Sequence, residues 1–378
     1  MGIRQTEDKG KSIDMENVHK GIAGLNPYLP GKPIDELARE LGISDIVKLA
    51  SNENPRGPGP IVLQALDGVR GDLSRYPDGS GFLLKEALAA HLSVNENQIT
   101  LGNGSNDVLD LVARVTIEPG YESIIAEHSF VVYRLATVCA GGELVTVPAS
   151  NFGADLEGML AAITDRTRTI FLANPNNPTG TWVGQSELTA FLDRVPAHIW
   201  VVLDEAYFEY IDDPQYPDGT TLLDRYPNLI VTRTFSKIHG LASLRLGYSI
   251  SSPAMADLLN RARQPFNCSS FALSAGVAAI ADENFVTTSA AMNREGMRQL
   301  VQGVERLGYD YIPSAGNFLA IDCGTSGPEI FDALLRKGVI TRPIAEYGLP
   351  HHLRVSIGLE AENERFLNAF GTVMAQRA

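Results

Sequence analysis

The sequence predicts an α/β fold in which a large three-layer α/β/α domain, built on a mostly parallel sheet, is joined to a smaller α+β domain. Short, continuously apolar runs alternate with helical segments through the middle of the chain, as strands covered on both faces do. From about residue 280 a long helical pattern is followed by shorter strands, which indicates a second architecture. A length of 378 residues is enough for two such domains.

The N-terminal elements follow a polar lead-in of about 20 residues, which we expect to be mobile. Pro33–Gly42 has a proline start and a glycine stop, so it is predicted to be a short helix. The apolar run Ile46–Ala50 is predicted to be a strand that enters the polar turn Ser51–Pro55. A helix, a strand, a glycine-rich turn and a second helix are predicted at Leu83–Leu92, Ile99–Leu101, Gly102–Asp107 and Val108–Val115.

The central elements are predicted to form the main sheet, because their strands are apolar over several consecutive residues rather than at alternate positions. A further strand can come from Leu244–Ser251. The predicted strands are Ser123–Ala126, Leu144–Val147, Thr169–Ala173, Ile199–Leu203 and Leu229–Thr232.

The C-terminal elements are predicted to be a long helix, Ala290–Leu307, three short strands and a last helix. We therefore expect a lead-in and arm over residues 1–45 that joins the small domain, a large domain over 46–280 and a small domain over 281–378. The three short strands are Phe318–Asp322, Val339–Arg342 and Leu353–Ile357.

Composition excludes several classes of partner. Lys and Arg number 31 against 45 Asp and Glu, which gives a net charge of −14. Without a basic run, such a chain is expected to repel nucleic acid and anionic membranes. Cys139, Cys268 and Cys323 are far apart and form no CxxC, so we expect neither a disulfide framework nor a metal site. No apolar segment is long enough to span a bilayer, and we expect a cytoplasmic protein.

Two polar segments at predicted strand ends are candidates for ligand binding, because ligands of open α/β sheets bind there. Gly102–Asn106 precedes a helix, whose free N–H groups suit a phosphate, although the same residues also make an ordinary capped turn. Asn174–Gly180 carries two prolines and a glycine. This rigid loop can direct Asn177 at a ligand, although tight turns use the same residues.

Two charged features occur at further strand ends. Asp204 ends a buried strand, where a carboxylate requires a partner such as a protonated pyridine nitrogen or a helix N-terminus. Lys237 is either a surface charge or an amine nucleophile for a carbonyl cofactor. Ser236 and Arg245 flank it, and arginine binds phosphate in a bidentate manner. Neighbouring cations would lower the pKa of the Lys237 amine.

Together these features supply an anion cradle, a carboxylate, an amide, a phenol and an amine, which match the groups of pyridoxal 5′-phosphate. The chain resembles the aspartate-aminotransferase-like, fold-type I pyridoxal-phosphate enzymes, and more narrowly the histidinol-phosphate aminotransferase family, over nearly its whole length. The segments that carry this resemblance are Leu25–Tyr28, Ser51–Pro55, Arg75–Gly79, Asn176–Gly180, Asp204–Tyr207, Ser236–Lys237 and Leu353–Gly358.

The resemblance implies roles for the cofactor-binding residues. Lys237 is expected to form the Schiff base and move the proton, and Asp204 to pair with the pyridine nitrogen. Asn177 and Tyr207 are expected to donate to the ring hydroxyl. Phe130 stands where many relatives carry tyrosine and keeps the stacking face. The expected phosphate cradle consists of Ser105, Asn106, Ser236 and Arg245.

The resemblance also implies a homodimer, in which Tyr76 reaches the cofactor phosphate of the neighbouring subunit. Arg354 is expected to bind the anionic end of the substrate, and Arg342, on another apolar strand, is a second candidate. Tyr28 and Asn54 are expected near the substrate. His239 is expected to support the site or the fold rather than act as the base, because Lys237 already performs the proton transfer.

The predicted activity is transamination between histidinol phosphate and 2-oxoglutarate in histidine biosynthesis. An aromatic amino-acid aminotransferase remains an alternative, because an arginine that binds a phosphate also binds a carboxylate. A decarboxylase of a phosphorylated amino acid on the same scaffold is a second. A regulatory domain that binds the cofactor without turnover is a third, but such regulators carry a DNA-binding domain that the short lead-in does not accommodate.

Overall fold

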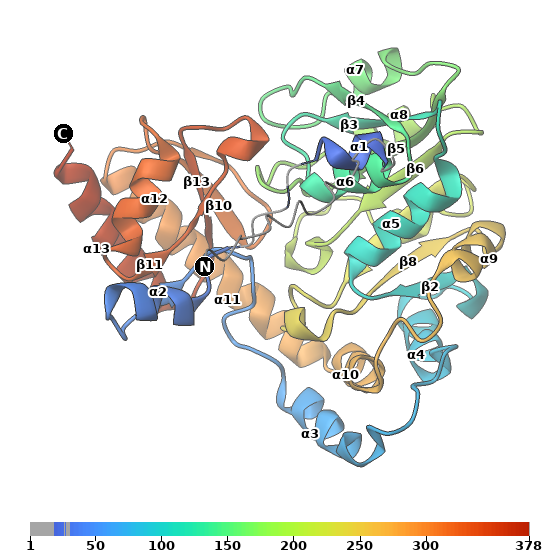
Figure 1. The fold of residues 1–378 in the computed structure, drawn as a ribbon, viewed down its shortest axis with the longest axis horizontal. Coiled ribbons are helices and arrows are strands. Elements are labelled where there is room, and N and C mark those ends of the chain that lie inside the picture. Colours follow the sequence, from blue (N-terminus) through green and yellow to red (C-terminus); the bar gives the residue numbers. More distant parts are fainter. Residues whose placement is uncertain (1–18, 26, 28–30, 378) are drawn as a thin grey trace, which may run out of the picture.

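The computed structural model describes residues 19–25, 27 and 31–377 (Figure 1). Most of the lead-in expected to be mobile therefore lies outside the described residues. A seven-stranded sheet forms the larger part of the molecule. Its strands are β2 (Ile99–Gly102), β3 (Glu122–Ala126), β4 (Glu143–Val147), β5 (Thr167–Ala173), β6 (Trp200–Asp204), β7 (Leu229–Thr234) and β8 (Gly247–Ser251).

The strand order of this sheet is β2-β8-β7-β6-β5-β3-β4. The neighbours from β7 to β4 are parallel, and β8 is antiparallel to both β7 and β2. The mostly parallel sheet predicted from the apolar runs is thus confirmed. Strand β8 begins later than predicted, because Ala242–Leu244 form a 3₁₀ turn and Arg245 takes a positive φ of 53° before the strand starts.

Helices cover both faces of the sheet, which explains why its strands carry no polar alternation. On β6, Val201 joins the core cluster of one face and Val202 that of the other. Helices α5, α6 and α9 contribute to the second cluster, and α4, α8 and α10 to the first. The helices of this part are α3 (Pro60–Gly68), α4 (Phe82–Leu92), α5 (Ser105–Thr116), α6 (Val131–Cys139), α7 (Leu156–Ala161), α8 (Gln185–Leu192), α9 (Pro253–Ala262) and α10 (Ser270–Ala281).

The smaller part contains an antiparallel sheet of order β12-β13-β10-β9 and a parallel pair, β1-β11. Its helices pack on these strands around a third core cluster. The strands are β1 (Val47–Lys48), β9 (Tyr311–Ile312), β10 (Phe318–Asp322), β11 (Val339–Ile340), β12 (Arg342–Pro343) and β13 (His352–Ser356). The helices are α2 (Ile34–Leu41), α11 (Glu283–Arg306), α12 (Gly327–Leu335) and α13 (Glu360–Ala375), while the short α1 (Lys20–Ala23) contacts α6.

Two segments belong to the smaller part in a way that the sequence does not reveal. The predicted strand at Ile46–Ala50 pairs with β11, so residues 47–50 pack with the C-terminal part and not with the large sheet. The segment Val339–Arg342, predicted as one strand, contributes to two sheets, because Arg342 pairs with β13 while Val339 pairs with β1. Among the described residues no helix is long and apolar enough to cross a membrane.

The helix α11 is the long connection between the two parts in Figure 1. It starts seven residues before the predicted Ala290, because the Asp282 side chain accepts a hydrogen bond from the Phe285 amide and caps the helix. The carboxyl ends of β5, β6 and β7 face the smaller part, with Ala173 beside Asp204 and Asp204 beside Thr232 in register. A site therefore forms where these strand ends meet residues of the smaller part.

Candidate active site

A pocket of about 170 Å³ lies at these strand ends and brings together most of the predicted site residues. It draws on the large sheet, on the loop that contains Ser51 and on the two C-terminal strands β12 and β13. The predicted residues that line it are Ser105, Asn106, Phe130, Asn177, Asp204, Tyr207, Ser236, Lys237, Arg245, Arg342 and Arg354.

Lys237 reaches the pocket from the loop after β7, where the fully buried Phe235 and Ile238 anchor the backbone on either side. Its Nζ donates to the carbonyl oxygen of Ser51 at 3.3 Å. Burial lowers the pKa of the Lys237 amine to about 8, and the nearby guanidinium of Arg354 contributes to the lowering. A substantial neutral fraction near physiological pH makes this amine a competent nucleophile and proton carrier.

Asp204 is held by two hydroxyl groups. The Tyr133 hydroxyl donates to its Oδ2 at 2.8 Å, and Thr232 Oγ1 donates to its Oδ1 at 3.2 Å. Burial raises the pKa of Asp204, whereas these hydrogen bonds and the charge of Lys237 oppose the rise. A buried carboxylate in a pocket is suited to pair with a cationic ring nitrogen.

Tyr133 is the residue that the sequence analysis missed at this carboxylate. It lies on α6, three residues after Phe130, and the two rings meet edge to face at a centroid distance of 6.0 Å. Its ring also stacks on Phe171 at 5.1 Å. The three-residue spacing on one helical face was a signal that could have linked Tyr133 to the ring-stacking position.

The anion cradle combines a helix N-terminus with Arg245. The α5 helix starts at Ser105, and Gly104 before it has a φ of 83°. A Cβ on Gly104 would lie 2.3 Å from Arg245 Nη2, so only glycine lets the guanidinium approach the helix start. Arg245 Nη1 donates to Ser236 Oγ at 3.2 Å. Free N–H groups, a guanidinium and hydroxyls in one place fit a phosphate.

Asn177 and Tyr207 both line the pocket. Asn177 Oδ1 accepts from Arg354 Nη1 at 2.6 Å, which directs its amide group. The Tyr207 hydroxyl accepts from Asn52 Nδ2 at 3.0 Å, and Asn52 lines the pocket. Asn52 was not predicted. Its φ of 55° turns the chain so that this asparagine reaches the pocket.

Asn54 lies outside the pocket lining, contrary to its expected place near the substrate. Its Nδ2 donates to the Ile238 carbonyl at 2.7 Å and to Ser289 Oγ at 3.1 Å, so this amide fastens the Lys237 loop to α11. A substrate contact by Asn54 gains no support from this position. Tyr28, the other expected neighbour of the substrate, lies outside the described residues.

Tyr76 is also not among the lining residues of the pocket. Its side chain is 83% exposed and stacks on Phe266 at a ring-centroid distance of 4.7 Å. A contact between Tyr76 and a cofactor in another subunit therefore remains a prediction.

Two arginines define the end of the pocket that belongs to the smaller part. Arg342 and Arg354 are directly opposite each other in the β12–β13 register, and both are buried. Arg354 Nη2 donates to the Ala50 carbonyl at 2.7 Å. Arg342 Nη2 donates to Glu346 Oε1 at 2.5 Å. Two guanidinium groups at one end of a pocket suit a carboxylate or a phosphate.

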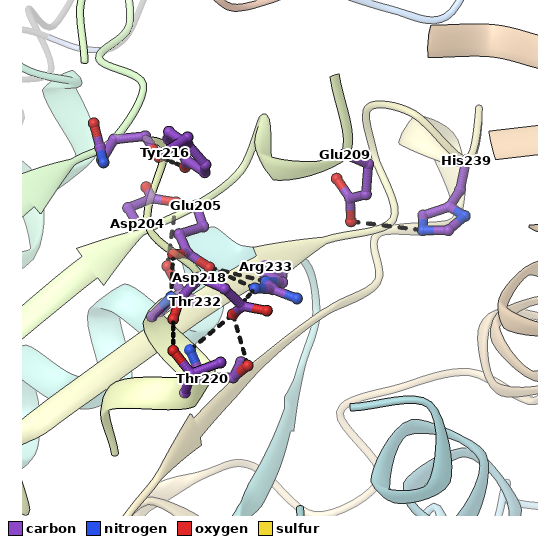
Figure 2. A network of polar contacts seen from close by, with 12 residues as sticks. Asp204, Glu205, Glu209, Tyr216, Asp218, Thr220, Thr232, Arg233 and His239 are labelled. Atoms are coloured by element: carbon purple, nitrogen blue, oxygen red, sulfur yellow. Dashed lines mark hydrogen bonds and ion pairs between the residues drawn. The ribbon is translucent and has the colours of Figure 1, made fainter. Parts of the chain in front are cut away.

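A buried ionic network underlies the strand ends (Figure 2). Arg233 donates to Glu205 Oε2 through Nη2 at 2.8 Å and to Asp218 Oδ1 at 2.7 Å. Its guanidinium also lies 3.6 Å from the centroid of the Phe208 ring. Because Glu205 directly follows Asp204, this network fixes the end of β6. The sequence analysis did not anticipate it, because Arg233 is separated from Glu205 by 28 residues.

His239 stands apart from the pocket, although it is only two residues from Lys237. Figure 2 shows it beside Glu209, with His239 Nε2 and Glu209 Oε1 3.9 Å apart. Burial lowers the pKa of His239 to about 4, so the ring is neutral at physiological pH. This position agrees with a supporting role and not with that of the base.

The residues present fit pyridoxal phosphate. The cradle at α5 suits its phosphate, Asp204 its ring nitrogen, Phe130 its ring face and Lys237 its aldehyde. These groups come from separate elements of the chain and line one pocket.

Comparison with known proteins agrees with this site. The family described as aminotransferase class I and II matches residues 44–370. Histidinol-phosphate aminotransferase 2 of Pseudomonas fluorescens strain Pf-5 is 55% identical over 358 residues, which cover 94% of this chain and 97% of the relative. Histidinol-phosphate aminotransferase 2 of Pseudomonas aeruginosa is 56% identical over 357 residues, with the same coverage of 94% and 97%.

Two solved structures share the fold. The histidinol-phosphate aminotransferase of Sinorhizobium meliloti, in complex with pyridoxal 5′-phosphate, superimposes with a TM-score of 0.89 at 31% identity and covers 97% of this chain and 100% of its own. The aspartate aminotransferase of Thermus thermophilus with maleate has a TM-score of 0.80 at 22% identity, over 91% and 97% of the two chains. The second likeness concerns the fold alone.

Proposed function

Because this chain belongs to the class I and II aminotransferase family, and within it to the histidinol-phosphate aminotransferases, we propose that it transfers the amino group of histidinol phosphate to 2-oxoglutarate. The observation that carries this proposal is the pocket itself. It combines a Lys237 amine of lowered pKa, the Asp204 carboxylate and a phosphate cradle with two arginines at the opposite end. We further assign the reaction to histidine biosynthesis, from the names of the relatives.

Bound pyridoxal phosphate supplies a ring that stabilises negative charge on the substrate Cα. Asp204, which accepts a hydrogen bond from the Tyr133 hydroxyl, would pair with the protonated ring nitrogen of the bound cofactor. The Lys237 Nζ would accept the proton from the substrate Cα and deliver it to the carbon of the cofactor aldehyde group. A pKa of about 8 lets this amine act both as base and as acid near neutral pH.

The arginine pair selects the substrates. Arg342 and Arg354 line the pocket from strands of the smaller part, whereas the cradle residues belong to the larger part, and the pair offers two guanidinium groups to one anionic group. The phosphate of histidinol phosphate uses both, and the distal carboxylate of glutamate or 2-oxoglutarate takes the same place in the second half of the reaction.

We also propose that the enzyme is a cytoplasmic homodimer. Large apolar side chains are exposed close to Tyr76, a pattern typical of a surface covered by another chain. In the proposed dimer, Tyr76 reaches the cofactor phosphate of the neighbouring subunit. This role accounts for a side chain that is exposed and does not line the pocket of its own chain. The exposed side chains of this region are Leu73, Tyr76, Phe82, Leu83 and Phe266.

The test is a donor comparison with the purified, cofactor-loaded protein. Histidinol phosphate and phenylalanine are supplied separately with 2-oxoglutarate, and glutamate formation gives kcat/KM for each. A phosphate carries more charge and one more acceptor oxygen than a carboxylate, and one additional charged hydrogen bond contributes about 1.5–3 kcal/mol, so we expect histidinol phosphate to be preferred by at least about tenfold. A higher value for phenylalanine would assign the enzyme to aromatic amino acids, and equal values would contradict the proposed preference for histidinol phosphate. The Lys237→Ala variant should show no turnover, and near-native turnover in it would overturn the mechanism.

A further inference from the structure

We propose that Glu346 sets the specificity of this site for anionic substrates, because its carboxylate competes with the anionic end of the substrate for the guanidinium of Arg342. The inference rests on the proposed substrate-binding role of Arg342 and concerns the affinity with which Arg342 binds the anionic end of the substrate. Glu346 neither lines the pocket nor touches the reacting atoms, so it acts through Arg342.

The contact between the two side chains is direct. Arg342 Nη2 donates to Glu346 Oε1 at 2.5 Å, and the two residues stand four positions apart, across the turn that contains η7 (Ala345–Tyr347). The Arg342 side chain is 10% exposed, whereas that of Glu346 is 41% exposed. The Glu346 carboxylate thus approaches the buried guanidinium of Arg342 from the solvent side. A substrate anion must either share this guanidinium with Glu346 or displace the Glu346 carboxylate from it.

The charges that line the pocket explain why this competition affects the binding of anions. Its lining contains four basic side chains and one carboxylate, that of Asp204, which the Tyr133 and Thr232 hydroxyls hold. Arg354 donates to neutral oxygens of Ala50 and Asn177. Glu346 supplies a negative charge at Arg342, so an incoming phosphate or carboxylate replaces this ionic contact like for like.

The surroundings of Glu346 provide a place for a displaced carboxylate. A separate cavity of about 240 Å³ is lined by Glu346, Tyr347 and Arg134. The backbone of the turn is fixed, because the His128 ring donates to the Tyr347 carbonyl at 2.5 Å. A rotation of the Glu346 side chain alone therefore moves its carboxylate from Arg342 toward the cavity that contains a second guanidinium.

This arrangement limits how tightly the site holds anions. Substrates and products of the proposed reaction all carry an anionic end, and uniformly tight binding would slow product release without accelerating the chemical step. The partly exposed ion pair between Arg342 and Glu346 is weak. The need to break it therefore reduces the affinity for anions by a modest factor, and it does not affect amino donors that lack an anionic end.

The test compares wild-type holoenzyme with the Glu346→Gln variant, which keeps the shape of the side chain and removes its charge. Inorganic phosphate is titrated into each by calorimetry. We expect Glu346→Gln to bind phosphate about two- to fivefold more tightly, the factor that corresponds to a half-exposed ion pair. The KM for histidinol phosphate should fall by a similar factor, and the KM for histidinol, which has no phosphate, should not change.

Two further variants separate the outcomes. In an Arg342→Gln background, Glu346→Gln should have no effect on phosphate affinity. Glu329→Gln, which removes a surface carboxylate paired with Arg377 at 2.7 Å, should leave phosphate affinity unchanged. Equal or weaker phosphate binding in Glu346→Gln would overturn the inference, as would an equal gain in Glu329→Gln. If the wild type does not turn over histidinol phosphate, the proposed function fails, yet the phosphate titration still decides the role of Glu346.

Discussion

The Tyr133 hydroxyl donates a hydrogen bond of 2.8 Å to Oδ2 of Asp204, and both side chains are buried. The donor comes from a helix and the acceptor from the end of a strand 71 residues later. The bond favours the ionised form of this buried carboxylate and opposes the rise in its pKa that burial causes, because a donor to the charged form lowers the pKa. Tyr133 thereby governs the group that we expect to hold the ring nitrogen of the cofactor.

Tyr133→Phe should lower kcat/KM by about ten- to a hundredfold, since a hydrogen bond to a charged group contributes about 1.5–3 kcal/mol. The ring stack on Phe171 is kept, so the fold should persist. Without its donor the pKa of Asp204 rises, and the acidic limb of the pH–activity profile should move to higher pH. Tyr216→Phe is the matched control, because its hydroxyl donates to the neutral Asn174 carbonyl. Equal losses in the two variants would contradict the assignment.

Uptake of pyridoxal phosphate by the apoenzyme should accelerate with rising pH around the Lys237 pKa of about 8. The neutral amine is the reactive form, and a lowered pKa means that it predominates above that value. Because the Arg354 charge contributes to the lowering, Arg354→Gln should move the rise to higher pH. Absorbance of the bound cofactor in stopped-flow mixing gives the rate. Arg298→Gln, which changes an exposed side chain on α11, should leave the profile in place. A profile of Arg354→Gln that matches the wild type would refute the electrostatic cause.

Arg233→Met should destabilise the protein by about 3–5 kcal/mol, because it leaves a carboxylate buried without its partner. Glu205 is completely buried, and Arg233 contacts it at 2.8 Å. The midpoint of urea unfolding measures the loss. Arg225→Met breaks the exposed pair with Asp193 and should change stability by less than about 1 kcal/mol. Similar shifts in both variants would mean that the buried network is not a major source of stability.

A mixed dimer tests whether Tyr76 acts across the interface. One chain carries Lys237→Ala and the other Tyr76→Ala, each with a different affinity tag, so that the mixed species can be isolated. If Tyr76 serves the neighbouring subunit, one of the two sites keeps both residues, and the mixed dimer should show about half of wild-type activity. If Tyr76 acts within its own chain, neither site is complete, and the mixed dimer should be no better than the Tyr76→Ala homodimer.

Much of the site was accessible from the sequence, because several of its residues are placed by local rules. Asp204 is the last residue of one apolar strand and Lys237 lies three residues after the end of the next, and the carboxyl ends of adjacent parallel strands meet at one edge of a sheet. The glycine turn before Ser105 marks a helix start in the same way. The family resemblance then supplied expected roles that position alone did not, among them the stacking of Phe130 on the cofactor ring.

Other site residues depend on contacts between distant segments. Asn52, not Asn54, lines the pocket, because a positive φ at Asn52 rotates the turn and the Asn54 amide fastens the lysine loop to α11. Glu346 approaches Arg342 through a turn between two short strands. Neither orientation follows from residue type or spacing.

The sequence by itself determined the layered α/β fold, the ends of the central strands and the lysine, aspartate and arginine that follow them, because apolar periodicity and strand-end polarity are local properties of the chain. Only the tertiary structure decided that residues 47–50 join the C-terminal part, that Tyr133 holds Asp204, and that Glu346 faces Arg342. These pairings join residues whose side-chain directions are fixed by packing between elements, and that packing is absent from any local pattern.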